Sequence, residues 1–542
     1  MMKIKLAGFN VDLESLKTIE NISEDIKSSL MDHNNNLDTD KDSKDDKINY
    51  VINSLDQQLK IINSLTPEVI SASYARISRD PKSIPELRKN AQKDIEKCRK
   101  TNSNIIFKMG HKSIAEHAVF NFDIMGVSRG LVEKIEQMRL TSYMEESQRY
   151  IDLNNYFDFV IPSELNTDNK LRETFIEQCD NNFKFYKIHK PFLIDWMKNN
   201  ISDDFFKKAN ISNKERKDET IFKLALEDSR YALPLATTTQ LGMTINARNL
   251  ETLITRMNSS KSSEEREFGK AIYDLVDGIA PSVIKYTEPT DYFSKTRDEL
   301  KNYITEFISN LHPSKIQPLD DIKSSSKKIN YFNNISKDKA IISGLIFSNS
   351  NLTYDQANYV FDIMNVSEKK EINRLAHKYQ ELHDVSLREF ELREPFELVI
   401  SASNFAQLKR HRMNTLIPQD YDIDAGYTTP ESLKYTNEKS FSGLIERTNY
   451  LYNVLKTNPI TKPIANYILT NAHNRRVLFD ANNRQLKAIA NERLNVYAQW
   501  DIRNTIEQVI KIAKEESPLT MEFAPGKHEY YDLKEKIYGN SQ

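Results

Sequence analysis

The feature that most constrains this 542-residue chain is an internal repeat. Three matched pairs of motifs carry it, at spacings of 272, 273 and 236 residues: His111 with His383, Arg139 with Arg412, and Asn246 with Asn482. A nearly constant spacing that changes once, by about 37 residues, is what a single insertion or deletion leaves behind. Chance similarity does not hold register across three motifs. The sequence therefore predicts a tandem duplication of one domain.

Two polar segments suggest how the repeats are arranged. Residues 311–330 combine two prolines, a serine run and clustered charge, which is typical of an interdomain linker. We therefore expect a first repeat over 1–310 and a second over 331–542. Residues 31–50 are polar and acidic, and we expect a solvated insertion within the first repeat.

Local patterns predict helix, strand and helix in each half. Ser83-Ile-Pro-Glu86 is a capping box, and the apolar residues after it, Leu87 to Cys98, fall on one helical face. Alternating apolar residues over 120–124 predict a strand, and 126–140 has helical periodicity. In the second half, FELVIS (396–401) corresponds to the strand and 404–415 to the helix. The segment 141–150 looks too polar to lie in a core.

Composition excludes several classes of protein. A formal net charge of -2 gives no basic field to hold nucleic acid, and only 12 glycines leave little material for phosphate loops. Cys98 and Cys179 are too few for a disulfide framework or a four-cysteine zinc site, and we expect Cys98 to pack in a core. No signal peptide or membrane-spanning run is apparent, so we expect a cytoplasmic protein without a resident metal.

Two short polar motifs are ambiguous when each is taken alone. Arg410-His411-Arg412 is consistent with a solvated helix end, where the helix dipole favours basic residues. Ser147-Gln148-Arg149-Tyr150 is consistent with a plain loop, although hydroxyl, amide and guanidinium groups in close sequence are also those that clamp a phosphate.

Together the motifs point to one family. GHKSIAEH, the strand, GVSRGLVEKIEQMRLTSYMEESQRY and ALEDSRYALPLATTTQLGMTINARNL resemble the flavin-dependent (alternative) thymidylate synthases, from about residue 60 to 525. The family signature is Arg-His-Arg followed by Ser-x-Arg-Tyr, and here it is divided between the copies. The first copy keeps Ser147 to Tyr150 but has Gln137-Met138-Arg139 in place of Arg-His-Arg. The second keeps Gln407 and Arg410 to Arg412 but has Asp420 and Asp422 in place of the Ser and Arg.

The later motifs divide in the same way. Arg230 matches the phosphate-side arginine of the family, and the second copy has Asn466 there. Arg493 matches the arginine that holds the pyrimidine, and the first copy has Met257 there, with Arg256 one residue early and so about 100° around a helix. Each copy has lost about half of a site.

The resemblance implies an α+β fold, with a central, mostly antiparallel sheet and long flanking helices in each copy. Family members are homotetramers whose sites lie between subunits. One subunit gives the Ser-x-Arg loop and the phosphate-side Arg, and a neighbour gives the Gln, Arg-His-Arg and the later Arg. The losses in this chain are complementary along that division. We therefore expect composite sites between the two repeats, and a homodimer that acts as a pseudo-tetramer.

The resemblance also implies an activity: conversion of dUMP to dTMP, with methylenetetrahydrofolate as carbon donor and FAD passing a hydride from NADPH. The residues it implies are Arg493 and Glu145 for catalysis; Ser147, Gln148, Arg149, Arg230, Gln407 and Arg410 for the substrate; and Arg410, His411, Arg412, Asn482, Arg484, His111, Ser113, Glu116, Asn246 and Arg248 for the flavin. Because both copies keep a His and an Asn, which copy serves the flavin stays open. Two alternatives are a flavin-dependent reaction on another pyrimidine nucleotide, and a non-catalytic nucleotide-binding protein.

Overall fold

The chain forms two four-stranded antiparallel sheets with the same strand order. The computed structural model describes residues 2–35, 41–153, 158–324, 328–382 and 384–539. The first sheet has the order β1-β2-β4-β3 and the second β5-β6-β8-β7. Their strands are β1 (Lys3–Phe9), β2 (Val119–Ser128), β3 (Thr141–Glu145), β4 (Thr238–Asn246), β5 (Ile329–Tyr331), β6 (Phe396–Ser401), β7 (Thr415–Pro418) and β8 (Asn474–Asp480). Every strand thus has a counterpart, which confirms the duplication and the α+β class.

The strands follow the predicted patterns. In β2, Phe120, Phe122 and Ile124 are buried while the intervening polar residues are exposed. The predicted strand 396–401 coincides with β6. The segment predicted to be too polar for a core begins instead with the edge strand β3, whose end residues Thr141 and Glu145 are buried.

The first half is otherwise helical. Its helices are α1 (Leu13–Asn35), α2 (Lys41–Asn63), α3 (Glu68–Arg76), α4 (Ile84–Lys93), α5 (Ile95–Ser103), η1 (Asn104–Lys108), η2 (Lys112–His117), α6 (Arg129–Ile135), η3 (Ser163–Thr167), α7 (Asn169–Asn200), α8 (Asp203–Lys208), α9 (Lys214–Ser229), η4 (Arg230–Ala232), α10 (Ala247–Asn258), α11 (Ser263–Val276) and α12 (Asp291–Ser309). The predicted helix over 126–140 is shorter, because its first residues complete β2.

The capping box at Ser83 is confirmed, but the helix it starts ends earlier than expected. Asp94 interrupts it and caps the next helix, α5, by accepting a hydrogen bond from the backbone of Lys97. Cys98 therefore lies on α5, where it is fully buried against Val69 and Ala91. Burial raises the pKa of the Cys98 thiol to about 12, so it stays protonated, as expected of a packing residue.

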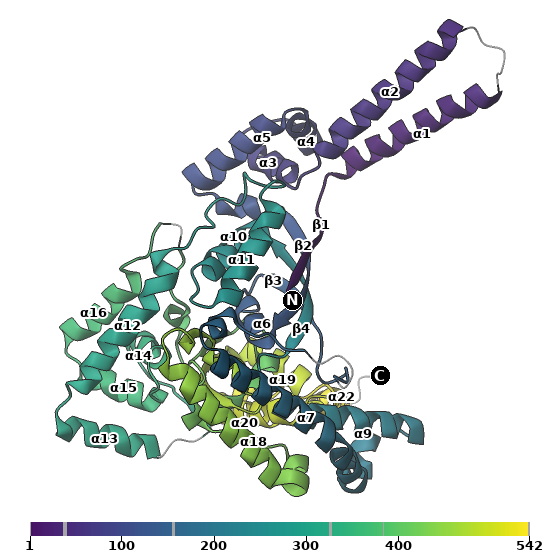
Figure 1. Cartoon of the computed structure of the whole chain (residues 1–542). Helices are drawn as coiled ribbons and strands as arrows, with labels where there is room; N and C mark the ends of the chain where they lie inside the picture. The colour runs from purple at the N-terminus through teal and green to yellow at the C-terminus, as the bar shows by residue number, and fades with distance from the viewer. Residues whose placement is uncertain (1, 36–40, 154–157, 325–327, 383, 540–542) are drawn as a thin grey trace.

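The second half contains α13 (Pro313–Ser324), α14 (Lys337–Ser348), α15 (Tyr354–Ile363), α16 (Val366–His377), η5 (Arg388–Glu391), α17 (Ala402–Leu408), η6 (Ile423–Ala425), α18 (Glu431–Thr457), η7 (Lys462–Ile468), α19 (Asn483–Arg493), α20 (Trp500–Glu516), α21 (Pro518–Met521) and α22 (Tyr530–Tyr538). The stretch 311–330 thus carries helix α13 and the start of β5. Helix α12 packs with α14 to α16 in a helical group at the left of Figure 1.

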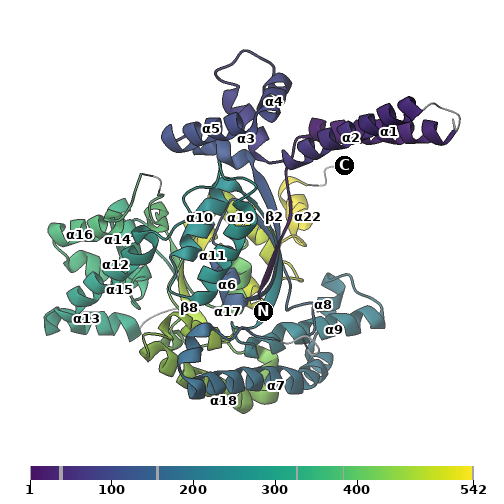
Figure 2. The same ribbon diagram turned by 45° about the horizontal axis from the view of Figure 1, so that its top comes forward.

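The two repeats meet across a pseudo-two-fold axis. Helices α7 and α18, which occupy equivalent places, pack against each other at the bottom of Figure 2. The segments that follow η4 and η7 pair antiparallel: Leu235 N donates to Leu469 O (2.7 Å), and Asn471 N donates to Leu233 O (3.0 Å). A β-bridge joins Pro234 to Thr470, 236 residues later, so the spacing of the repeat places the axis here.

Helices α1 and α2 form a hairpin that projects away from both sheets in both views (Figures 1 and 2). The predicted insertion 31–50 falls at the tip of this hairpin, and residues 36–40 lie outside the described residues. Across the described part of the chain, no helix is long and apolar enough to cross a membrane.

Candidate active site

Residues that the resemblance assigns to the substrate in the two repeats lie together within one chain. The loop after β3 in the first repeat places Arg149 beside the second repeat. Arg149 Nε donates to Glu227 Oε1 (2.6 Å), and its Nη2 donates to the backbone carbonyl of Tyr497 (2.9 Å). Its Nη1 reaches Gln407 Oε1 at 3.5 Å. A guanidinium of the first repeat thus lies against the Gln of the second.

Arg230 enters the same cluster from η4. It is 3% exposed, and its Nη2 donates to Gln499 Oε1 (3.3 Å), which also accepts from Gln407 Nε2 (2.5 Å). The described residues give Arg230 no carboxylate partner. Burial lowers the pKa of the Arg230 guanidinium to about 10, and the neighbouring Arg149 cation adds to the shift. A buried cation that lacks a counter-ion favours the binding of an anion.

Glu145 lies between arginines of both repeats. Its side chain is buried, with Arg129 Nη1 at 2.5 Å from Oε1 and Arg410 Nη2 at 3.6 Å from Oε2. Neither carboxylate oxygen has a hydrogen-bond partner of good geometry among the described residues. Glu145 is therefore held in place by charge and keeps its capacity to accept hydrogen bonds.

Arg493 and His411 form the other wall of the cluster. Arg493 Nε donates to His411 Nε2 (2.9 Å), and its Nη2 donates to the backbone carbonyl of Gln407 (3.2 Å). Burial, together with the Arg493 cation, lowers the pKa of His411 to about 3. The imidazole is therefore neutral with its proton on Nδ1, and it forms no true ion pair with Glu492, 3.9 Å away.

The loop Ser147-Gln148 is also tied to the second repeat. Ser147 Oγ accepts from the backbone N–H of Arg149 (3.3 Å). Gln148 Oε1 accepts from Asn471 Nδ2 (3.0 Å), which also bonds the carbonyl of Arg230 (2.9 Å). Gln148 Nε2 is buried without a partner among the described residues, so the loop has unused donor capacity.

The Arg-His-Arg turn is fixed to the start of α19. Asn482 caps this helix by accepting from the backbone of Gln485 (3.1 Å), and the Gln485 side chain donates to the carbonyl of Met413. Arg484 follows on the exposed side of the same first turn. The hydrogen bond from Gln485 thus ties the residue after the Arg-His-Arg turn to the first turn of α19.

Comparison with known proteins decides the family. The model of the family described as thymidylate synthase complementing protein matches residues 60–282 and 351–519. The chain belongs to this family. A flavin-dependent thymidylate synthase of Clostridium tetani is 32% identical over 227 residues, which cover 41% of this chain and 83% of that protein.

Two relatives match across about four fifths of this chain. A UPF0159 protein of Thermoplasma acidophilum is 22% identical over 468 residues, or 80% of this chain and 90% of its own. A UPF0159 protein of Chlamydia muridarum is 22% identical over 482 residues, or 82% of this chain and 87% of its own. This member of the family therefore has relatives that match most of its length as well as relatives that match less than half of it.

The other residues that the family resemblance assigns to the flavin lie elsewhere. Glu116 and Arg248 form an ion pair (2.6 Å), and Asn246 caps α10 by accepting from the backbone of Asn249 (3.0 Å). His111 and Ser113 are exposed at the start of η2. Within the described ranges, this group makes no hydrogen bond or ion pair with the Arg-His-Arg turn. His383, the counterpart of His111, lies outside the described residues.

The pseudo-two-fold axis relates the candidate site to a second position at the inter-repeat interface. That second position is occupied by the protein's own charged side chains. Arg139 forms an ion pair with Glu391, and Arg388 Nη2 donates to the carbonyl of Gln137 (2.9 Å). Arg256 Nη2 donates to the Gln137 side chain (2.5 Å). Asp422, where a nucleotide-binding Arg is expected, caps the short helix η6 instead. The nucleotide-side residues that the resemblance assigns therefore lie together at only one of the two positions within the described structure.

Sequence reasoning missed three residues that hold the site together: Arg129, Glu227 and Gln499. All three lie in motifs that carry the family resemblance: GVSRG, EDSRYALPL and AQWDIR. The available signal was their position inside these motifs, each beside a residue already assigned by the resemblance or within a matched segment. That signal does not reveal the partner, because Glu227 meets Arg149 from 78 residues away and Gln499 meets Arg230 from 269 residues away.

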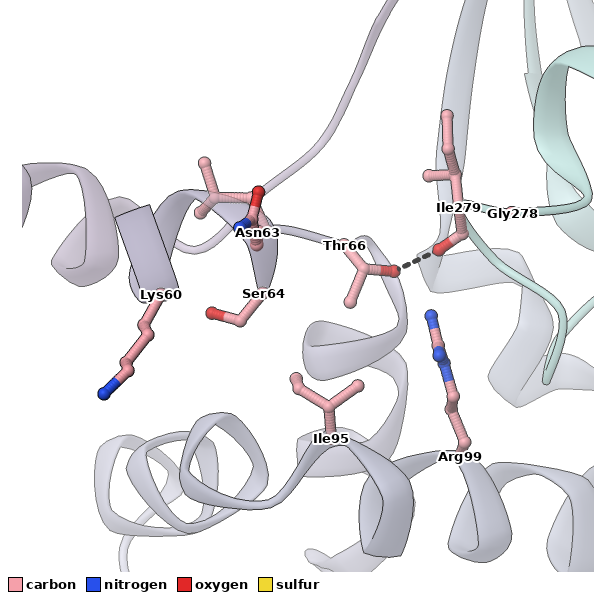
Figure 3. Close-up of a pocket in the computed structure, with 9 residues that line it drawn as sticks. Lys60, Asn63, Ser64, Thr66, Ile95, Arg99, Gly278 and Ile279 are labelled. Atoms are coloured by element: carbon pink, nitrogen blue, oxygen red, sulfur yellow. Dashed lines mark hydrogen bonds between the residues drawn. The ribbon is translucent and has the colours of Figure 1, made fainter. Parts of the chain in front are cut away.

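A cavity of about 410 Å³ lies apart from this site, at the base of the α1–α2 hairpin (Figure 3). Its lining includes Lys60, Asn63, Ser64, Thr66, Ile95, Arg99, Gly278 and Ile279. At the edge of the cavity, Thr66 Oγ1 donates a hydrogen bond to Ile279 O (2.7 Å). Arg99 forms an ion pair with Glu68 (2.8 Å). Of the two cations in its lining, Arg99 is thus paired with a carboxylate, and the cavity does not gather the several arginines found at the inter-repeat site.

Proposed function

We propose that this chain is a flavin-dependent thymidylate synthase that converts dUMP to dTMP at a composite site between its two repeats. The observation that carries the proposal is an excess of positive charge, of which the Arg410 share is 47% exposed and the rest mostly withdrawn from solvent. Five guanidinium groups converge there, against two buried carboxylates, Glu145 and Glu227, in contact with them; the five are Arg129, Arg149, Arg230, Arg410 and Arg493. A phosphate monoester dianion is the ligand that such an excess favours.

In this proposal the phosphate group of dUMP binds to residues of the first repeat. Arg149 and Arg230 would donate charge-assisted hydrogen bonds to phosphate oxygens, together with Ser147 Oγ and the backbone N–H of Gln148. Arg230 supports this role because its guanidinium is buried without a carboxylate. Gln407 and Arg410 would complete the pocket from the second repeat.

In this proposal the uracil ring of dUMP binds near Arg493. Its guanidinium would stabilise negative charge that develops on the uracil ring as the ring becomes nucleophilic. Because His411 is neutral, it accepts a hydrogen bond from Arg493 and orients that cation without competing for the charge. Glu145 would orient the nucleotide with the carboxylate oxygens that the protein leaves without hydrogen bonds.

In this proposal FAD binds at the Arg-His-Arg turn. Arg410 and Arg412 would meet the diphosphate of FAD, with His411, Asn482 and Arg484 beside them, and the 47% exposed Arg410 side chain is accessible to such a group. Bound FAD supplies the hydride, drawn from NADPH, for the carbon that methylenetetrahydrofolate delivers. His111, Ser113, Glu116, Asn246 and Arg248 are assigned to the flavin by resemblance alone.

A cysteine nucleophile plays no part in this proposal. Cys98 and Cys179 are both buried, and burial raises the pKa of each thiol. Neither residue contacts the arginine cluster in the described structure. The chain's own residues therefore contribute binding, orientation and charge stabilisation.

The visible spectrum of the purified protein with added FAD tests this function. We expect bound flavin absorption that shifts when dUMP is added, followed by dTMP formation with methylenetetrahydrofolate and NADPH. A colourless protein that does not bind added FAD would instead indicate a non-catalytic nucleotide-binding protein.

One observation favours a second candidate, a flavin-dependent reaction on another pyrimidine nucleotide. Two relatives that match across 80% and 82% of this chain are named UPF0159 proteins and not thymidylate synthases. Met144, where many family members carry Asn, is 77% exposed one residue before Glu145. A spectral shift and turnover with another pyrimidine nucleotide, but not with dUMP, would support this candidate over the first.

A further inference from the structure

The projecting α1–α2 hairpin carries an apolar face that no described residue of the chain covers. On α2, Ile48, Ile52, Leu55, Leu59 and Ile62 are exposed by 56%, 50%, 43%, 54% and 44%. Their spacing of four, three, four and three residues places them in one stripe, the a and d positions of two heptads. A continuous exposed stripe of this kind marks an interaction surface rather than ordinary scattered exposure.

The stripe is separate from the face that α2 packs against α1. Gln58 of α2 faces α1, because its Nε2 donates to the carbonyl of Ile19 (3.0 Å) and to Ser23 Oγ (2.5 Å). Val51 and Ile61 lie on the same side as Gln58 and are half-buried. The stripe is centred about 90° around the helix from that side. A helix that is apolar on two adjacent faces needs more neighbours than one partner helix provides.

Two features identify the neighbour as a second copy of the same helix. First, the stripe is nearly symmetric about Leu55. In an antiparallel pair Leu55 faces Leu55, Ile48 faces Ile62, and Ile52 faces Leu59, so every apolar side chain meets an apolar side chain. Second, the stripe contains no charged residue that would need a complementary partner.

The charge of the hairpin argues against a membrane as the occupant. Among its described side chains, residues 13–31 and 45–63, seven are acidic and four are basic. Helices that lie on anionic lipid surfaces are instead rich in Lys and Arg. The hairpin also lies almost entirely before residue 60, where the family match begins.

We infer that two chains associate through antiparallel packing of α2 on α2, so that the two hairpins form a four-helix bundle. The pairing needs no part of the proposed active site. It supplies a contact through which the duplicated chain dimerises, and it leaves the inter-repeat site of each chain intact.

Single cysteine substitutions test the pairing under mild oxidation. Leu55→Cys should cross-link two chains, because Leu55 faces its own counterpart. Ile48→Cys should not, since its counterpart lies about 21 Å away along the bundle, at 1.5 Å per residue, and a disulfide needs Cα atoms within about 7 Å. Combining Ile48→Cys with Ile62→Cys should restore cross-linking. Cys98 and Cys179 are buried and do not interfere.

Gln57→Cys, exposed on the opposite side of α2, is the matched control and should stay uncross-linked. Leu55→Glu should lower the molecular mass measured by light scattering to that of one chain, with an unchanged circular dichroism spectrum. Failure of Leu55→Cys to cross-link would overturn the proposal. So would cross-linking of Ile48→Cys alone, or a wild-type chain that is monomeric and binds anionic phospholipid vesicles.

Discussion

Replacing Arg149 with glutamine is expected to weaken dUMP binding by about 100-fold or more. The change removes a charge-assisted contact to the phosphate, and such hydrogen bonds contribute about 1.5–3 kcal/mol each. It also leaves the buried Glu227 carboxylate without its nearest cation, so a negative charge stays close to the incoming dianion. Isothermal titration with dUMP, at fixed ionic strength, measures the loss.

Arg139→Gln is the matched control for this measurement. Arg139 also lies at the inter-repeat interface and also pairs with a carboxylate, Glu391, but at the position that lacks the Ser and Arg of the family. We expect its dUMP affinity to stay within about twofold of wild type, because a partly exposed ion pair contributes little. If both variants lost dUMP affinity equally, the nucleotide would not bind preferentially at the Arg149 position, and the assignment would be wrong.

Replacing Arg493 with glutamine is expected to lower kcat by about 10²- to 10³-fold, with a smaller change in KM. Removal of one preorganised charge-stabilising donor typically has an effect of this size on the chemical step. Loss of the cation should also raise the pKa of His411, because Arg493 is one of the two causes that hold it near 3. Steady-state kinetics and the NMR titration of the His411 ring measure the two effects.

Arg256→Gln provides the corresponding control on α10, the helix of the first repeat equivalent to α19. Arg256 bonds Gln137 and lies at the position filled by internal ion pairs, so kcat should change by less than about threefold. A large loss of kcat in Arg256→Gln, or an unchanged kcat in Arg493→Gln, would contradict the assignment of the pyrimidine pocket.

Much of the fold was predictable because it depends on local and repeated patterns. The matched spacing of His111, Arg139 and Asn246 with their counterparts predicted two copies of one domain, and the two sheets have the same strand order. Alternation in β2 and the run FELVIS predicted strands because side chains on a strand alternate between its two faces.

The errors in secondary structure arose where one residue overrides a pattern. Apolar periodicity from Leu87 to Cys98 suggested one helix, but Asp94 caps a new helix instead, and its backbone dihedral angles are not helical. The proline- and serine-rich stretch 311–330, for which we predict a linker, contains the helix α13 with Pro318 inside it, which its composition does not reveal. Tertiary packing, which composition does not encode, decides such cases.

The site was predictable as a set of residues but not as a geometry. The complementary losses at Asp422 and Met257 indicated which halves were kept. They did not reveal that both halves meet within one chain, because the pseudo-two-fold pairing of Pro234 with Thr470 depends on the packing of α7 and α18. Nor did they reveal Arg129, which contacts Glu145 only once β3 has folded back alongside β4.

The central claim is that each chain builds one complete site from its own two repeats, and complementation tests it most directly. Arg149→Gln and Arg410→Gln each disable a different repeat. They should be mixed under conditions in which differently tagged chains are shown to exchange. We predict that the mixture binds no more dUMP than the two variants measured apart, because each chain still carries one damaged half-site. Recovery of high-affinity binding in the mixture would contradict a site built within one chain.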